Sequence, residues 1–263
     1  MDIRLGRVPA SRETPPTRKY ARPLLLLPEL FTTISHLSLL MGYLGSLGWE
    51  VFALDLYASP DAARASFAQL VELVREAVVA AGEGAIVIGH GFGGLIALKL
   101  AAMPGTGAAV AIAPLPPRWA SPLYAGWRNR VAPLIGRPLA PPSGRRLFEL
   151  VADADPFQRE ALIRNLRPAP AIAVLEAARG ALNLRAPEVR RCLVVTGDSD
   201  IFAPHDRVVR LATQLGAEIA TLKGRGHWLI GGRGLERVIA ETQRFLIKQF
   251  GQELLLLYSD DRS

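Results

Sequence analysis

Residues 85–94 read Ala-Ile-Val-Ile-Gly-His-Gly-Phe-Gly-Gly, and this stretch decides the fold. Its first four residues are apolar, which is typical of a buried strand. They lead directly into four glycines within six residues, and residues 93–103 continue with the small and apolar residues of a closely packed helix. Because glycine accepts tight turns and close backbone approach, the stretch predicts a strand, a sharp turn and a helix.

Short apolar runs alternate with amphipathic segments along the chain on both sides of this stretch. Strands are predicted at 24–27, 50–54, 85–89, 108–112, 192–196 and 218–222, with helices at 33–47, 66–81, 93–103, 206–215 and 235–250. Strands that alternate with helices form right-handed crossovers, so we expect an α/β fold with a mostly parallel sheet flanked by helices. Ligands bind at the carboxyl edge of such a sheet.

Residues 114–187 interrupt the alternation and hold twelve of the 20 prolines. Helices are still predicted there at 147–152, 156–165 and 171–179. We therefore expect a Pro-rich helical lid, inserted before the strand at 192–196 and lying over the carboxyl edge of the sheet.

The lid divides the predicted core into residues 23–113 and 188–250, with residues 251–263 as a tail. Residues 1–22 are rich in Arg and contain Pro15-Pro16, so they predict an extended, poorly structured basic arm.

Composition limits the remaining choices. The chain has 263 residues, 50% of them apolar and 21% charged, which excludes a disordered chain and fits one α/β domain. The single Cys192 excludes a disulfide framework and is interpreted as strand core.

No apolar run reaches the length of a membrane span and no signal peptide is evident, so a soluble, cytoplasmic protein is expected. The basic residues, mostly Arg, are scattered despite a net charge of +7, which argues against a nucleic-acid partner. The oligomeric state stays open.

The glycine turn resembles the nucleophile elbow of the α/β-hydrolase superfamily, G-x-S-x-G on a strand-to-helix turn. Gly89, His90, Phe92 and Gly93 fit that pattern, and the nucleophile position is Gly91, which has no side chain. The resemblance extends over roughly residues 23–250 and implies an α/β-hydrolase fold. His90 is expected to pack beneath the turn rather than to take part in catalysis.

The other two positions of the family's catalytic triad are also matched, in the family's order. Asp200 lies four residues before Pro204 after the strand at 192–196, with Asp198 as the fallback, and His227 lies in Gly224-Arg-Gly-His-Trp228. The resemblance implies that Asp200 orients His227, which acts as a base.

The resemblance also implies an oxyanion hole made of the backbone N–H groups of Phe92 and Leu30, which do not depend on the side chain at position 91. The loop that supplies Leu30 departs from the family, because Glu29 stands where a glycine is usual. We consider two hypotheses for Glu29: an acid or base in the site, or a side chain turned to solvent.

Together these features predict an α/β-hydrolase-fold enzyme that lacks the serine nucleophile and needs no cofactor or metal. It would act on a small apolar ester- or carbonyl-type substrate, with His227 and Asp200 activating water or abstracting a proton. The expected substrate contacts are Trp119, Trp127, Trp228 and Phe31.

Two alternatives remain open. One is a catalytically inactive ligand-binding or regulatory protein on the same scaffold. The other is a hydrolase whose elbow Ser or Asp was replaced in the laboratory. Retention of both Asp200 and His227 favours an enzyme, since a binding pocket alone has no need for an Asp–His pair.

Overall fold

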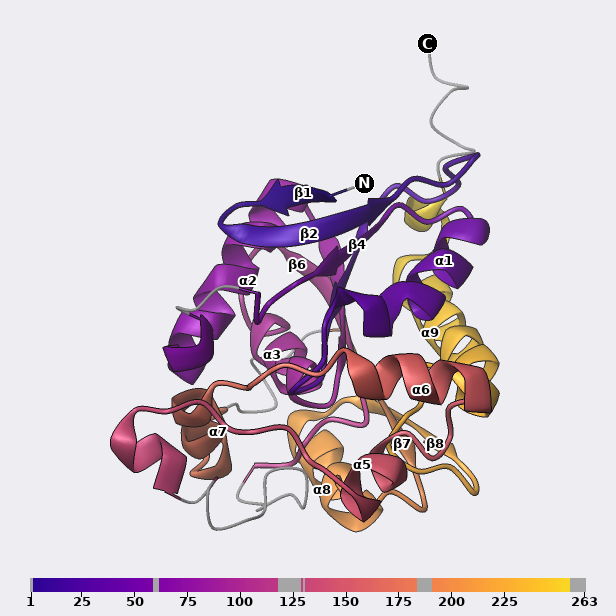
Figure 1. Ribbon diagram of the computed structural model, residues 1–263. Helices are drawn as coiled ribbons and strands as arrows, with labels where there is room; N and C mark the ends of the chain where they lie inside the picture. Colours follow the sequence, from indigo (N-terminus) through magenta and orange to yellow (C-terminus); the bar gives the residue numbers. More distant parts are fainter. Residues whose placement is uncertain (1, 59–61, 118–128, 130, 184–190, 256–263) are drawn as a thin grey trace.

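Figure 1 shows the computed structural model, which describes residues 1–263 except 1, 59–61, 118–128, 130, 184–190 and 256–263. The described strands are β1 Asp2–Leu5, β2 Val8–Glu13, β3 Leu24–Leu27, β4 Val51–Leu54, β5 Ala85–His90, β6 Thr106–Ile112, β7 Cys192–Gly197 and β8 Glu218–Leu222. The described α-helices are α1 Ser38–Ser46, α2 Phe67–Ala81, α3 Phe92–Leu100, α5 Arg145–Leu150, α6 Pro156–Arg164, α7 Ala171–Ala178, α8 His205–Leu215 and α9 Leu235–Phe250. Short 3-10 helices are η1 Ile34–Leu37, η2 Ala62–Arg64, η4 Ala132–Ile135, η6 Gly232–Gly234 and η7 Gly251–Leu254.

The described strands form one sheet in the order β1-β2-β4-β3-β5-β6-β7-β8. Pairing is parallel from β4 to β8, which confirms the predicted α/β class. Helices α2 and α3 cover one face of the sheet, and α1 and α9 cover the other (Figure 1). Because both faces are covered, β3, β4 and β5 are buried at every position, as parallel strands usually are.

The amino-terminal segment corrects one prediction. Residues 2–13 form a β-hairpin rather than a poorly structured arm, and β2 pairs antiparallel with β4. The prediction was wrong because the arginines hid an alternation in which Val8 and Ala10 are buried between exposed or half-buried neighbours. Arg12 then forms an ion pair with Glu50, whose carboxylate is largely buried.

The helices α5, α6 and α7 lie between β6 and β7 in the chain, within the region that we call the insert (residues 114–187). The predicted helices of this region are confirmed. The contacts that join the insert to the core include His36 Nε2 to the Leu162 carbonyl at 2.9 Å, the Arg167 N–H to the Phe31 carbonyl at 2.7 Å, and the Phe67 N–H to Glu176 at 2.7 Å. A role of the insert as a lid stays a prediction.

Among the described helices, none is both long enough and apolar enough to cross a membrane.

Candidate active site

The sharp turn predicted at residues 89–94 joins β5 to α3. Its central residue, Gly91, has φ 53° and ψ −113°, a conformation that L side chains rarely adopt. The Gly91 N–H donates to the carbonyl of Ile112 at 2.8 Å, which ties the turn to β6. A β-carbon on Gly89 would lie 2.1 Å from the Gly93 carbonyl oxygen, so the close approach of strand and helix requires glycine there.

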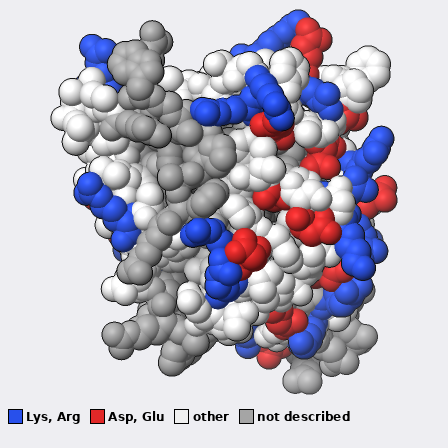
Figure 2. All heavy atoms as spheres, turned by 90° about the horizontal axis from the view of Figure 1, so that it is seen from below, with Lys and Arg blue, Asp and Glu red and all other residues white. Residues whose placement is uncertain are grey.

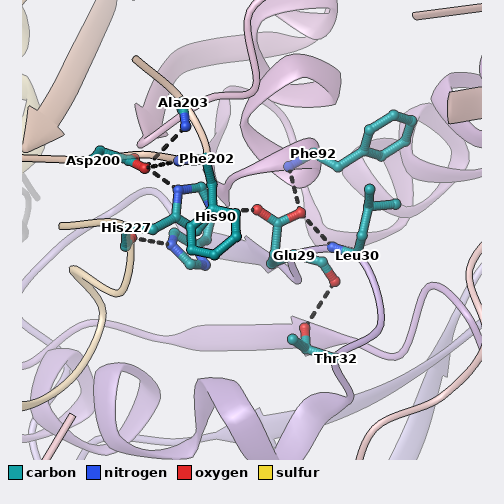
Figure 3. A network of polar contacts seen from close by, with 9 residues as sticks. All are labelled: Glu29, Leu30, Thr32, His90, Phe92, Asp200, Phe202, Ala203 and His227. Carbon is teal, nitrogen blue, oxygen red and sulfur yellow. Dashed lines mark hydrogen bonds and ion pairs between the residues drawn. The ribbon is translucent and has the colours of Figure 1, made fainter. Parts of the chain in front are cut away.

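Glu29 lies in the loop after β3 and points into the site rather than to solvent. Its Oε1 accepts hydrogen bonds from the backbone N–H groups of Leu30, at 2.5 Å, and Phe92, at 3.0 Å. Figure 3 shows this carboxylate between the two N–H groups on one side and His227 on the other. The two donors expected to form an oxyanion hole therefore converge on one point, and Glu29 fills it.

The second carboxylate oxygen fills the space that Gly91 leaves. A β-carbon built on Gly91 would lie 1.3 Å from Glu29 Oε2. Glu29 is 1% exposed, so the hypothesis of a solvent-facing side chain is wrong. A carboxylate oxygen from one loop thus stands at the turn where the family's nucleophile would begin.

His227 lies between two carboxylates. Its Nδ1 is 2.7 Å from Asp200 Oδ2 and its Nε2 is 2.7 Å from Glu29 Oε2. Burial alone would lower the pKa of His227, but the charges and hydrogen bonds of Asp200 and Glu29 outweigh burial and raise this pKa to about 10. At neutral pH His227 is therefore an imidazolium that donates to both carboxylates, not a free base.

Asp200 rather than Asp198 is the partner of His227. Asp200 Oδ1 accepts from the backbone N–H groups of Phe202, at 2.8 Å, and Ala203, at 2.9 Å, which leaves Oδ2 aimed at the imidazole. Asp198 is exposed and instead accepts from the Gly224 N–H at 2.7 Å.

His90 supports the loop that bears His227. Its Nε2 is 2.9 Å from the His227 carbonyl oxygen, and burial lowers the pKa of His90 to about 4. A neutral His90 must donate from Nε2 to that carbonyl. The side chain is 1% exposed, and its packing beneath the turn stays a prediction.

The predicted substrate contacts are less well supported than these groups. Trp228 is 1% exposed and packs edge-on against His90 and His36. Phe31 is fully buried with a left-handed φ of 68°. Trp119 and Trp127 lie outside the described residues. Contact of any of the four with substrate stays a prediction.

Sequence reasoning missed Tyr57, which lies in the turn after β4. Its side chain is buried, and its hydroxyl has no hydrogen-bond partner among the described residues. Burial, together with the charge of Glu29, raises the pKa of Tyr57 well above its usual value. A tyrosine three residues past a strand gives no sequence signal of its own, because its importance depends on which loop packs beside it.

Comparison with known proteins adds the family. A model described as the alpha/beta hydrolase family matches residues 28–241. No curated protein matches the chain. Among solved structures, a monoacylglycerol lipase from Paleococcus ferrophilus is 18% identical with a TM-score of 0.73, and the match covers 91% of this chain and 98% of that one. A thermophilic esterase from Thermogutta terrifontis is 16% identical with a TM-score of 0.70, covering 95% and 99%. At these identities the likeness is one of fold.

Proposed function

Because this chain belongs to the alpha/beta hydrolase family, we propose that it is a hydrolase in which the Glu29 carboxylate replaces the missing elbow nucleophile. One observation carries the proposal: Glu29 Oε1 accepts from both hole donors while Oε2 stands at Gly91 and contacts His227. The set Glu29–His227–Asp200 then corresponds in space to a nucleophile, a base and its orienting acid.

The same contacts select the kind of substrate. A carbonyl substrate needs the two N–H donors for its own developing oxyanion, and here they are bound to Glu29. Attack by a carboxylate on a saturated carbon creates no oxyanion on a substrate carbonyl, so the substrate does not need these two N–H groups. Glu29 Oε1 can therefore stay bonded to them during the attack. We therefore assign a small apolar substrate that carries a halogen or an epoxide oxygen on the reacting carbon.

In the first step, a lone pair of Glu29 Oε2 forms a bond to the substrate carbon. The bond from that carbon to the halogen or epoxide oxygen breaks, and the leaving group departs with the electron pair. Glu29 becomes a neutral ester whose carbonyl oxygen, Oε1, stays bonded to Leu30 and Phe92. Loss of the Glu29 charge lowers the pKa of His227, whose Nε2 proton passes to the epoxide alkoxide or to solvent.

In the second step, the neutral His227 takes a proton from water as the water oxygen attacks the Glu29 carboxyl carbon. The resulting oxyanion forms on Oε1, where the two N–H donors already lie. Collapse releases the product alkoxide, which takes the proton from His227, and the Glu29 acid returns its proton to the imidazole. Asp200 holds the Nδ1–H throughout.

Trapping the ester tests this proposal. In His227→Ala, n-butyl bromide or styrene oxide is expected to leave an ester on the Glu29 peptide, seen by mass spectrometry, because the base for the second step is gone. Single turnover of the unmodified protein in heavy-oxygen water should place the label in the Glu29 carboxylate. Glu29→Gln is the matched control and should show neither result. Absence of the ester with both probes would contradict the proposal.

The second candidate is the ester- or carbonyl-type chemistry expected from the sequence, with His227 and Asp200 acting on water or substrate. It is favoured by retention of both hole donors, but it requires Glu29 to leave the hole. It predicts that hydrolysis of p-nitrophenyl acetate survives Glu29→Gln and is lost in His227→Ala. An inactive binding protein would show neither ester hydrolysis nor esterification of Glu29.

A double variant probes the scaffold shared by both candidates. Glu29→Gly with Gly91→Ser empties the hole and restores an elbow hydroxyl beside His227. Hydrolysis of p-nitrophenyl acetate is expected from this double variant. Gly91→Ser alone should be inactive on this ester because the new side chain meets Glu29 Oε2.

A further inference from the structure

Asp153 belongs to the insert, yet it contacts the loop that bears His227. It lies in the turn between α5 and α6, and its Oδ2 accepts a hydrogen bond from the Gly226 N–H at 2.7 Å. Its other oxygen, Oδ1, lies 3.9 Å from the Arg225 guanidinium. The Asp153 side chain is 13% exposed, so water competes weakly for these contacts. One carboxylate of the insert thus contacts the two residues that directly precede His227.

Two glycines show how closely Asp153 approaches this part of the core. A β-carbon on Gly226 would lie 2.9 Å from Asp153 Oδ2, and one on Gly232 would lie 2.0 Å from the Asp153 carbonyl oxygen. Both separations are shorter than any that a real β-carbon tolerates, so the approach requires glycine at both positions. The side chain and the backbone of Asp153 are therefore both packed against the core.

The turn that carries Asp153 is itself held in place. The Arg159 guanidinium donates to the carbonyls of Ala152, at 3.1 Å, and Ala154, at 3.2 Å, which are the residues on either side of Asp153. The Ala154 N–H also donates to the Val151 carbonyl at 3.0 Å. Asp153 is therefore a fixed point of the insert, to which the His227 loop is attached.

The four residues 224–227 form the approach to the imidazole, and each of them is held by a hydrogen bond. Contacts within the core are Gly224 N–H to Asp198 Oδ1 at 2.7 Å, Ser199 N–H to the Arg225 carbonyl at 2.9 Å, and His90 Nε2–H to the His227 carbonyl at 2.9 Å. Gly226 is held instead from the insert, by Asp153. Loss of that bond would release the residue next to His227 while its neighbours stay fixed.

We propose that Asp153 is a positioning residue, through which the insert sets where the His227 imidazole lies between Glu29 and Asp200. Both contacts of the imidazole are 2.7 Å long, and hydrogen bonds weaken steeply when the donor is displaced or tilted. A misplacement of about 1 Å can slow a reaction by about 100-fold. The effect on the reaction rests on the proposed function, whereas the effect on the imidazole does not.

Nuclear magnetic resonance tests the position of the imidazole without any substrate. The ring Cε1–H signal of His227, assigned by its loss in His227→Ala, should shift in Asp153→Ala. Its titration midpoint should fall from the pKa of about 10, because the imidazole no longer lies midway between the two carboxylates that raise this pKa. The titratable groups that face His227, which are Glu29, Asp200 and His90, are all retained in this variant. Asp153→Asn keeps an acceptor oxygen and should restore the signal and the midpoint.

Glu176→Ala is the matched control. Glu176 is also a carboxylate of the insert that accepts a core N–H at 2.7 Å, but its donor is Phe67 at the start of α2. Its removal should leave the His227 signal and midpoint unchanged. Equal changes in Glu176→Ala and Asp153→Ala, an unchanged signal in Asp153→Ala, or failure of Asp153→Asn to restore it would each overturn the role. Asp153→Ser, whose side chain is too short to reach the Gly226 N–H, gives the same test if Asp153→Ala does not fold.

Single-turnover kinetics with n-butyl bromide connect the role to the proposed reaction. In Asp153→Ala, hydrolysis of the Glu29 ester should slow by about 10- to 100-fold, because the base for that step is displaced. Formation of the ester should change much less, since Glu29 Oε1 stays bonded to Leu30 and Phe92. If no ester forms in any variant while the His227 signal still depends on Asp153, the nucleophile role fails and the positioning role stands. If the ester forms and is hydrolysed equally fast with and without Asp153, the positioning role is overturned.

Discussion

Gly91 and Glu29 are complementary residues. The glycine removes a side chain from the elbow, and the glutamate, which stands where a glycine is usual, supplies a carboxylate oxygen in the same space. Each departure from the family pattern looks damaging by itself, because the first removes a nucleophile and the second places a charge in the oxyanion hole. Taken together they place a Glu29 carboxylate, the His227 imidazole and the Asp200 carboxylate in one row of contacts, built from different parts of the chain.

This complementarity predicts a coupling in stability. Gly91→Ala should lower the free energy of unfolding by at least about 2 kcal/mol, because of the left-handed backbone and the clash with Glu29 Oε2. In Glu29→Ala/Gly91→Ala the loss should be smaller than the sum of the single losses, by about 1–3 kcal/mol. Urea unfolding of the four proteins measures this coupling. Additive losses would show that the two side chains do not share the space.

The charge state of His227 predicts how stability depends on pH. Its pKa is raised from 6.5 to about 10 in the folded chain. As the pH rises, the unfolded state therefore loses this proton at a lower pH than the folded state does. The resulting stabilisation is complete below pH 6.5 and is lost as the pH rises through about 10. Urea unfolding across this range should show the loss. Glu29→Gln should flatten it by removing one of the two carboxylates, and an equally steep loss would contradict the assignment.

At the scale of elements, the site depends on loops that the insert holds in place. Arg167 connects the insert to the Glu29 loop through Phe31 and to the Tyr57 loop through Asp55. His36 in η1 connects to α6, because Nδ1 accepts from the Thr33 N–H at 3.0 Å and Nε2–H donates to the Leu162 carbonyl. The core partners of these contacts, Phe31 and His36, lie within seven residues of Glu29 in the chain. A movement of the insert would therefore shift the loop that bears Glu29.

The His36 contact predicts acid-sensitive anchoring of the insert. Burial lowers the pKa of His36 below its ordinary 6.5, and a proton on Nδ1 would remove the bond from Thr33. The folded state is therefore disfavoured as the pH falls below 6.5. Amide exchange in α6 should quicken over that range in the unmodified protein. In His36→Phe it should be faster at all pH values and lose this dependence; an unchanged pH dependence would show another group to be responsible.

At the scale of the molecule, the hairpin β1–β2 closes one edge of the sheet against β4. Deletion of residues 1–13 should expose the β4 edge and leave the largely buried Glu50 without Arg12. We expect concentration-dependent aggregation, measured by size-exclusion chromatography with light scattering. Arg4→Gln, which leaves the strand pairing intact, is the control. A monodisperse deletion variant would show that this edge needs no cover.

The arginine excess has a partial explanation at this scale. In the face drawn in Figure 2, basic and acidic side chains lie interspersed over the described surface. Arg145, Arg164 and Arg210 each pair with a carboxylate one helical turn away. Such exposed pairs contribute about 0–1 kcal/mol each, so they shape the surface charge more than the stability.

The sequence by itself determined the layout of this protein. Alternating apolar runs and amphipathic segments specified the parallel sheet, since burial on both faces demands continuous apolar strands. The spacing of glycines specified the elbow, because only glycine allows that turn and that approach of β5 to α3. The positions of Asp200 and His227 followed from the resemblance and from their places after strands at the carboxyl edge.

Tertiary structure alone decided what the elbow contains. Glu29 and Gly91 are 62 residues apart, and no local pattern states that one fills the space of the other or that His227 bonds both Glu29 and Asp200. Tyr57 was identified only from the tertiary structure, in which its hydroxyl is buried and the charge of Glu29 contributes to its raised pKa. These contacts join loops that follow different strands, and the order of the strands in the sheet, which is established only on folding, decides which loops meet.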